Sequence, residues 1–355
     1  MLRAVNFPWW LKPEIIPGLP FRWYSVMYIV AFTIAYFLYR RQIRERRFPM
    51  TDDDLTSLFF WGIIGLLLGA RVFATLVYET SDIYRRRPWL VFSPFRDGKF
   101  TGFMGMSYHG GVIGGALGTF VWCVVKRRDP REIADMFVAS IPLGYTFGRL
   151  GNFINGELYG RITGGPLGMI FPDGFVAMQD KYWNEVAAAA AAMGIPPSHG
   201  IVNPPRHPSQ LYEALFEGVI LWLIIWFFRN RKPFKGFLVS LYLAGYGLFR
   251  FFIEYFREPD ADLGYRIEFI KSNAVPALSH PPLSFSTGQI LSFGMVVLGI
   301  VWLVAASRLP DREPVRLYPA AGESADANFA ARTAAASKEE NAERNRRRKL
   351  RKKLR

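Results

Sequence analysis

The sequence has few of the residues from which cysteine-based sites are built. Cys123 is the only cysteine among 355 residues, and apolar residues surround it at positions 120–122 and 124–125. A single thiol excludes a disulfide within the chain and a cysteine metal cluster. Reactive cysteines need a polar, electropositive setting, so these surroundings also argue against a catalytic thiol.

Signatures of metal sites and of cleaved leaders are missing as well. The four histidines never adopt a metal-binding spacing such as His-Glu-x-x-His, and we expect neither a metal site nor a cofactor. The first 22 residues contain four prolines and lack the basic, apolar and small-residue order of a cleavable signal. We therefore expect that no leader is removed.

Long apolar runs dominate what the sequence does contain. Hydrophobic residues make up 51% of the chain and collect in runs of about 20, the length that a helix needs to cross a bilayer. The sequence therefore predicts an all-α integral membrane protein with about seven transmembrane helices. The predicted spans cover residues 24–40, 55–78, 109–126, 134–152, 211–229, 237–255 and 288–307.

Basic residues beside these runs predict the orientation in the membrane. Residues 40–47, 126–128 and 229–232 form short basic connections, which favour the cytoplasmic side. This assignment places the N-terminus outside and the C-terminus in the cytoplasm. The arginines at 85–87 then fall on the outer side, but long loops follow the rule weakly.

The remaining segments divide the chain. Residues 1–23 are predicted to be an extracytoplasmic N-terminal segment, and residues 24–307 the membrane domain. An outer insertion at about 153–210, between helices four and five, is too long for a plain connection, so we expect a small extracytoplasmic structure there. Residues 308–355 read as a disordered, basic cytoplasmic tail attracted to anionic lipid. Membrane topology explains the net charge of +15 better than nucleic acid does, and we expect no nucleic-acid partner.

Inserting an ionisable side chain into a membrane costs roughly 2.5 to 3.5 kcal/mol on insertion scales. Each such residue is therefore expected to have an interaction partner or a function. One stretch, residues 107–115, places His109 at the start of a glycine-rich helix, although glycines equally suit close helix packing. In residues 148–160, Arg149 and Asn152 are three apart and share a helix face. Arginine can fork two hydrogen bonds onto phosphate. The plain alternative is a structural ion pair between Arg149 and Glu157.

A third stretch, residues 246–257, holds Arg250 and Glu254 four apart on one helix face. An internal salt bridge that merely neutralises both is the plain alternative. A second arginine pointing into the bundle favours an anionic ligand instead, because two guanidinium groups at one depth suit an anion. Tyr24 alone, beside a tryptophan at a helix start, is typical of an interfacial anchor.

Four motifs follow one another along the chain: His109-Gly-Gly-Val-Ile-Gly, Gly148-Arg-Leu-Gly-Asn-Phe-Ile-Asn-Gly-Glu157, His207-Pro-Ser-Gln-Leu-Tyr-Glu213 and Tyr246-Gly-Leu-Phe-Arg-Phe-Phe-Ile-Glu254. Together they resemble the prolipoprotein diacylglyceryl transferases of bacterial inner membranes. The resemblance covers roughly residues 21–308. The segment 175–205 and the tail beyond 308 do not match the family pattern.

The resemblance implies seven membrane helices with the N-terminus outside. It implies transfer of the diacylglyceryl group of phosphatidylglycerol to the lipobox cysteine of a preprolipoprotein, forming a thioether and releasing glycerol phosphate. The catalytic residues that it implies are His109, Arg149, Arg250 and Tyr24. Those that it implies for phosphatidylglycerol binding are Arg149, Asn152, Glu157, Gly160, Tyr246, Arg250 and Glu254.

These residues suit a reaction in which a thiolate attacks a glyceryl carbon while a phosphate ester leaves. Our hypothesis is that Arg149 and Arg250 clamp the phosphate and that Glu157 and Glu254 orient the two guanidinium groups. His109 is either the general base or a headgroup ligand, since an imidazole accepts protons near neutral pH. A phospholipid or anionic-solute transporter is the alternative, but such proteins usually show repeated halves, and the sequence shows no repeat.

Overall fold

The computed structural model describes residues 4–16, 22–79, 83–93, 95–96, 99–100, 105–258, 265–269, 275–281 and 283–309. The basic tail predicted at 308–355 lies outside these residues except for its first two. The chain divides into two compact units. The first comprises Met1–Tyr39 and Ala134–Val315, and the second comprises Arg40–Ile133 and Arg316–Arg355. Helices α1 (Trp23–Arg46) and α5 (Pro130–Val138) cross the division.

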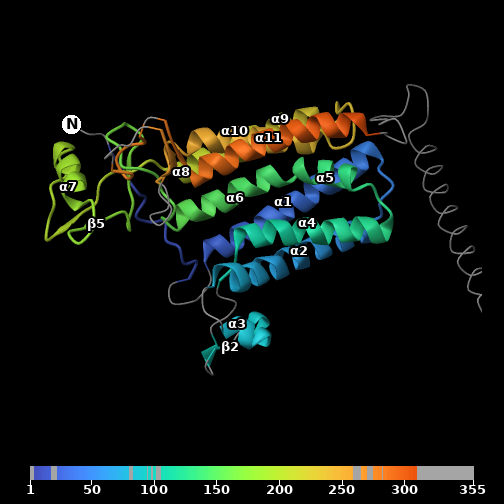
Figure 1. Ribbon diagram of the computed structural model, residues 1–355, viewed down its shortest axis with the longest axis horizontal. Helices are drawn as coiled ribbons and strands as arrows, with labels where there is room; N and C mark the ends of the chain where they lie inside the picture. Colours follow the sequence, from blue (N-terminus) through green and yellow to red (C-terminus); the bar gives the residue numbers. More distant parts are fainter. Residues whose placement is uncertain are drawn as a thin grey trace, which may run out of the picture. The chain divides into compact units, whose positions relative to one another are not determined.

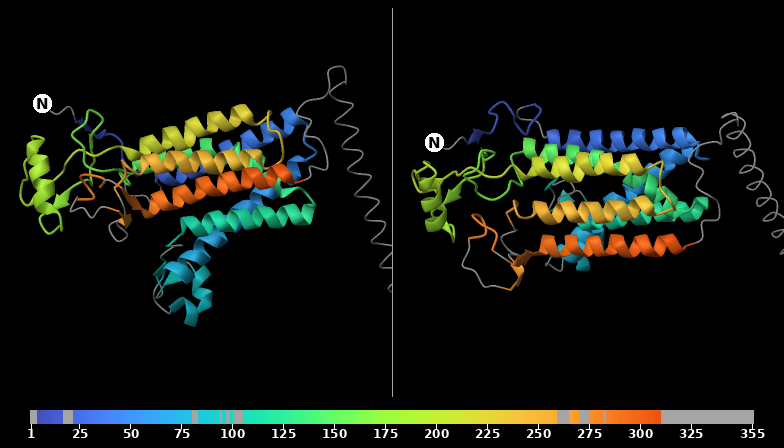
Figure 2. Two further views of the ribbon diagram at one scale, coloured as in Figure 1. Left: turned by 45° about the horizontal axis from the view of Figure 1, so that its top comes forward. Right: turned by 90° about the horizontal axis from the view of Figure 1, so that it is seen from above.

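Helices make up most of the first unit and run alongside one another in Figures 1 and 2. Besides the first part of α1, they are α6 (Ile141–Ile154), α8 (Ser209–Glu213), the π-helix η3 (Ala214–Ile220), α9 (Leu221–Phe228), α10 (Phe237–Ile253) and α11 (Thr287–Arg308). Segments α8, η3 and α9 form one continuous helix, and α10 packs along α11. At one end of this continuous helix, buried Leu221 and Ile225 form an apolar core with Leu238 and Ala139.

A buried ion pair fixes the start of α10 in this unit. Asp135 accepts hydrogen bonds from Lys232 Nζ at 3.0 Å and from the backbone N–H groups of Gly236 and Val239. Both charged side chains are fully buried. The carboxylate therefore satisfies N-terminal amides of α10 that have no partner within the helix.

The segment between α6 and α8 builds a small structure of its own. It contains β4 (Met169–Ile170), β5 (Val176–Ala177), α7 (Trp183–Ala192) and β6 (Ile201–Val202). Strand β4 pairs in parallel with β1 (Val5–Asn6), and β5 pairs antiparallel with β6.

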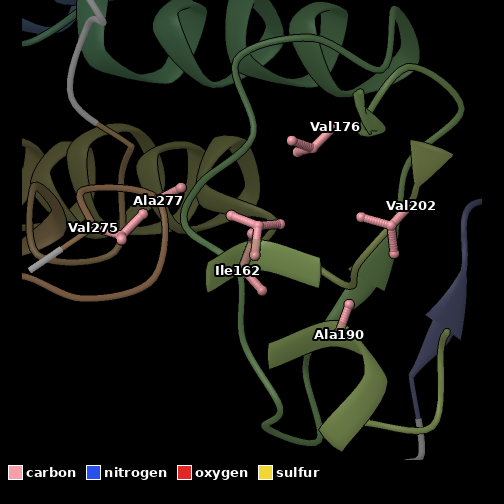
Figure 3. Packing of buried hydrophobic residues seen from close by; sticks show 7 residues of the cluster. Ile162, Val176, Ala190, Val202, Val275 and Ala277 are labelled. Atoms are coloured by element: carbon pink, nitrogen blue, oxygen red, sulfur yellow. The ribbon is translucent and has the colours of Figure 1, made fainter. Parts of the chain in front are cut away.

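Figure 3 shows the hydrophobic core of this small structure, to which the loop before α11 contributes two residues. Its buried members are Ile162, Val176, Val186, Ala190, Val202, Val275 and Ala277. That loop follows β7 (Tyr265–Glu268) and leads into β8 (Ser284–Ser286), which pair antiparallel.

The second unit is built on two helices packed closely together. These are α2 (Asp52–Phe73), extended by the π-helix η1 (Ala74–Tyr78), and α4 (Tyr108–Lys126). A Cβ on Gly114 would lie 2.1 Å from the carbonyl oxygen of Gly65, so only glycines allow this approach. The chain segment that connects the two helices contains α3 (Ile83–Arg86), the 3-10 helix η2 (Pro88–Phe92), β2 (Phe95–Arg96) and β3 (Lys99–Phe100).

The structure is mostly helical, as an all-α membrane protein requires. Among the described residues, four helices are long and apolar enough to cross a membrane: Asp52–Tyr78, Tyr108–Lys126, Ser209–Phe228 and Thr287–Arg308. Helix α10 is apolar but shorter. The single helix predicted at 134–152 is instead broken into α5 and α6, because Pro142 in the first turn of α6 has no N–H to continue the helix.

Candidate functional site

Glu213, the last residue of α8, lies at the centre of a group of arginines. Its carboxylate lies 2.7 Å from Arg149 Nε, 3.1 Å from Arg250 Nη1 and 2.6 Å from Arg257 Nη1. These arginines belong to α6, to α10 and to the turn after α10. A buried anion here offsets the cost of placing several guanidinium groups together. We call these residues, with Glu217 and Glu254, the arginine–glutamate cluster.

The carboxylates of this cluster are more deeply buried than the guanidinium groups. The side chains of Glu213, Glu217 and Glu254 are 1%, 0% and 7% exposed. The arginine side chains at 149, 250 and 257 are 18%, 17% and 14% exposed. The buried anions therefore hold the cations in place, and the guanidinium groups are the more accessible part of the cluster.

A π-helical segment aligns two glutamates of the cluster with apolar core residues. Buried residues follow one another at intervals of four along this helix: Glu213, Glu217, Leu221 and Ile225. In a regular α-helix of 3.6 residues per turn, residues four apart drift around the axis by about 40° per step. The π-helix η3 holds more residues per turn and offsets this drift. The two glutamates and the apolar core residues thus share one face of the helix.

Tyr145 links Arg149 to Glu217. Its hydroxyl donates to Glu217 Oε2 at 2.5 Å and accepts from Arg149 Nε at 2.6 Å. The Arg149 guanidinium also lies over the Tyr145 ring, 4.8 Å from its centroid. Tyr246 stacks edge-on against the same ring, with the centroids 6.0 Å apart. Arg149 is therefore held by an anion, a hydroxyl and an aromatic face.

A second layer of polar contacts leads outward from Arg149. Arg149 Nη1 donates to Asn152 Oδ1 at 3.3 Å, and Asn152 Nδ2 donates to Glu157 Oε1 at 3.0 Å. Asn155 Nδ2 donates to the same oxygen at 3.1 Å. The Gln210 side chain donates to the backbone carbonyl of Glu157. This turn after α6 is thereby tied to the start of α8.

Close backbone packing fixes the chain just beyond this layer. Gly160 N donates to the carbonyl oxygen of His207 at 2.8 Å, and a Cβ on Gly160 would lie 2.1 Å from the oxygen of Phe256. His207 packs its ring against Tyr212 and Phe256. Burial, reinforced by the positive charge of Arg161, lowers the pKa of His207, which lies outside the membrane helices. The ring therefore favours its neutral form.

Tyr24 and His109 occupy different parts of the structure. Tyr24 in α1 packs against Gly151 of α6, next to Asn152, and its hydroxyl lies 2.9 Å from that of Tyr28. His109 belongs to the second unit, in the first turn of α4. Its Nδ1 lies 2.7 Å from the hydroxyl of Tyr78 in η1.

Comparison with known proteins decides which family this cluster represents. The family model "Prolipoprotein diacylglyceryl transferase" matches residues 14–305. The chain belongs to this family. It is 52% identical over 319 residues to the phosphatidylglycerol–prolipoprotein diacylglyceryl transferase of Treponema denticola, covering 84% of this chain and 94% of that protein. The Treponema pallidum enzyme of the same name is 48% identical, covering 89% and 99%. That of Chlorobaculum tepidum is 39% identical, covering 87% and 96%.

Within this transferase-family chain, the first unit brings together seven of the residues named from the sequence. Arg149, Asn152, Glu157, Tyr246, Arg250 and Glu254 join the cluster or its outer layer, and Gly160 lies beside it. One expected contact differs: Glu157 pairs with no arginine among the described residues, because Glu213 takes that place. The sequence interpretation missed Tyr145, Glu213, Glu217 and Arg257. A strict four-residue spacing of acidic residues in an apolar run was the available signal for the two glutamates.

Proposed function

We propose that this protein transfers the diacylglyceryl group of phosphatidylglycerol to the thiol of the lipobox cysteine in preprolipoproteins. The sulfur–carbon bond forms as the bond between the glyceryl carbon and the phosphate oxygen breaks. The thiol proton passes to a base, and glycerol phosphate leaves. Membership of the transferase family supports this activity, and the partly exposed guanidinium groups over buried carboxylates are the observation that carries it.

The arginines supply what the leaving phosphate needs. The contacts of Arg149 with the described residues run through Nε and Nη1, and Nη2 makes no hydrogen bond to them, which leaves its donors for an anionic oxygen. Arg250 adds a second guanidinium held by Glu213 and Glu254. Donors fixed before the reaction stabilise developing charge without reorganising. Asn152 completes this clamp by holding Arg149.

His109 is our candidate for the base. If Nδ1 donates to the Tyr78 oxygen, the lone pair of Nε2 stays available to accept the thiol proton. The role thus requires the tautomer in which Nδ1 carries the proton, and the Tyr78 hydroxyl can accept from that tautomer. Tyr24 and Tyr246 offer hydroxyl groups for the lipid headgroup.

The proposed membrane topology follows from the basic connections between the apolar runs. We propose a bacterial inner-membrane protein with seven crossings, counting α5 and α6 as one, with the N-terminus outside and the C-terminus in the cytoplasm. Reporter fusions at the loops 126–128 and 229–232 would test this orientation.

The deciding experiment uses purified protein, phosphatidylglycerol labelled in the diacylglyceryl glycerol, and a lipobox peptide. We expect label on the cysteine, lost with Arg149→Ala. Arg250→Lys keeps the charge but loses the planar fork and should also reduce turnover. His109→Gln should abolish turnover if His109 is the base, and mainly weaken lipid binding if it is a headgroup ligand. Lipid movement without transfer would instead indicate a transporter.

A further inference from the structure

The first turn of α11 contacts the carboxylate of Glu254 in two independent ways. The Ser286 hydroxyl donates to Glu254 Oε1 at 2.9 Å. Gly288 presents its bare Cα to the same group: a Cβ there would lie 2.6 Å from Oε1, 2.8 Å from Cδ and 3.0 Å from Oε2. Real Cβ atoms essentially never approach an atom closer than 3.0 Å. The turn is shaped to the carboxylate.

Ser286 can donate to Glu254 because its other hydrogen bond uses a lone pair. As the N-cap of α11, its oxygen accepts from the N–H of Gln289 at 3.2 Å. The side chain of Gln289 in turn accepts from the N–H of Ser286 at 3.1 Å, which completes a capping box. A serine hydroxyl has one donor and two acceptor positions, so both roles coexist. The rigid cap therefore fixes where the donor points.

The two carboxylate oxygens of Glu254 therefore have different partners. Oε1 is held by Ser286, while Oε2 lies 3.3 Å from Arg250 Nη2 and 3.7 Å from Arg257 Nε. Ser286 is 2% exposed and Glu254 5% exposed, so water does not compete readily for these contacts. A shift of the carboxylate would change its ion pairs with both arginines.

We propose that Ser286, Gly288 and Gln289 form a positioning site that sets the Glu254 carboxylate and, through it, Arg250 for the reaction. The three residues belong to none of the four sequence motifs. The inference rests on the transferase activity proposed above. These are positioning residues, because their contacts reach Arg250 only through Glu254.

The test compares two glycine-to-alanine changes in the same helix. Gly288→Ala places a methyl group against the carboxylate, whereas Gly294→Ala meets nothing within 4 Å. In the labelled-lipid assay, we expect Gly288→Ala to lower kcat about tenfold or more, because small misplacements of catalytic groups cost that much. Gly294→Ala should keep the wild-type kcat. Both variants should retain the wild-type KM for the lipobox peptide. Thermal unfolding must show that both are fully folded, because a partly unfolded sample would also lower the apparent kcat at an unchanged KM.

A double-mutant cycle separates positioning from packing. Glu254→Asp retracts the carboxylate by one methylene, so the added methyl of Gly288→Ala then meets less of it. We expect the double variant to be no slower than Glu254→Asp alone, whereas independent effects would multiply. Multiplying effects would overturn the inference, as would a wild-type rate in Gly288→Ala.

Ser286 variants supply a second measurement if Gly288→Ala fails to fold. Ser286→Thr keeps the donor and the cap and should stay active, while Ser286→Gly is tolerated at an N-cap but has no hydroxyl to donate. We expect Ser286→Gly to fold and to lose kcat by about tenfold or more. An active Ser286→Gly would overturn the inference. Absence of transfer by the wild-type protein would instead refute the proposed function.

Discussion

Replacing Glu213 by glutamine removes the central anion of the arginine–glutamate cluster and keeps the shape of the side chain. The Glu213 side chain is 1% exposed and lies within 3.1 Å of Arg149, Arg250 and Arg257. The change leaves three arginines facing the two remaining carboxylates of the cluster. Excess positive charge should attract the anionic lipid headgroup at least as well as before. The guanidinium groups, however, lose the negative charge and one of the two acceptor oxygens that aim them, because an amide has a single acceptor oxygen.

The expected effect therefore falls on turnover. Truncating one partner of a buried, hydrogen-bonded charge pair costs about 2–5 kcal/mol. Each 1.36 kcal/mol corresponds to a tenfold change in rate, so we expect kcat to fall about 30-fold or more in Glu213→Gln. The KM for phosphatidylglycerol should stay constant or decrease.

The assay measures initial rates in mixed micelles over a series of phosphatidylglycerol mole fractions. Glu185→Gln is the matched control, because Glu185 is an exposed glutamate on α7. Thermal unfolding of each variant establishes that the compared proteins are folded. A raised KM with an unchanged kcat would refute the reasoning, since Glu213 would then contact the lipid directly. Rates equal to those of the control would refute it as well.

Three further changes test the scaffold around the cluster. Gly160→Ala would place a Cβ 2.1 Å from a backbone oxygen and should abolish folding or transfer. In the control Gly164→Ala, the nearest atom to the new Cβ is 3.8 Å away, and both folding and transfer should be kept. Thermal unfolding and transfer assays measure the two outcomes. Asp135→Asn leaves Lys232 buried without its anion and should lower the free energy of unfolding by roughly 3–5 kcal/mol, measured by denaturation in detergent. Because the pKa of His207 is lowered on folding, its contribution to stability is complete above the unfolded value of 6.5 and is lost as pH falls below it. His207→Asn should flatten the dependence of thermal stability on pH in that window.

Helical spacing explains which parts of the site were predictable. Arg149 with Asn152, and Arg250 with Glu254, are three and four residues apart, and the structure places each pair in contact. Such contacts depend only on the helix repeat. The partner of Arg149 was not predictable in this way: Glu213 lies 64 positions along the chain, and only the packing of α6 against α8 and η3 brings them together.

Boundaries within the helices depended on local chemistry that hydropathy does not record. The apolar run at 134–152 is continuous in composition, yet Pro142 divides it into two helices. That signal was present in the sequence, since proline within a helical pattern ends or kinks the helix. The positioning site at the start of α11 had no comparable signal, because a Ser-Thr-Gly-Gln segment indicates a helix start without indicating which carboxylate lies against it.

The π-helix η3 explains why a helical periodicity analysis does not place Glu213 and Glu217 on the buried face. With regular α-helical geometry, three steps of four residues would turn Ile225 away from Glu213 by about 120°. A hydropathy pattern would then assign the glutamates to one face and the apolar core to another. The wider turns of η3 offset that rotation, so charged and apolar residues continue one buried face along a single membrane helix. The carboxylates of Glu213 and Glu217 are therefore fixed by the same packing that holds Leu221 and Ile225 against α10. The arginines that pair with these carboxylates are held in place in turn.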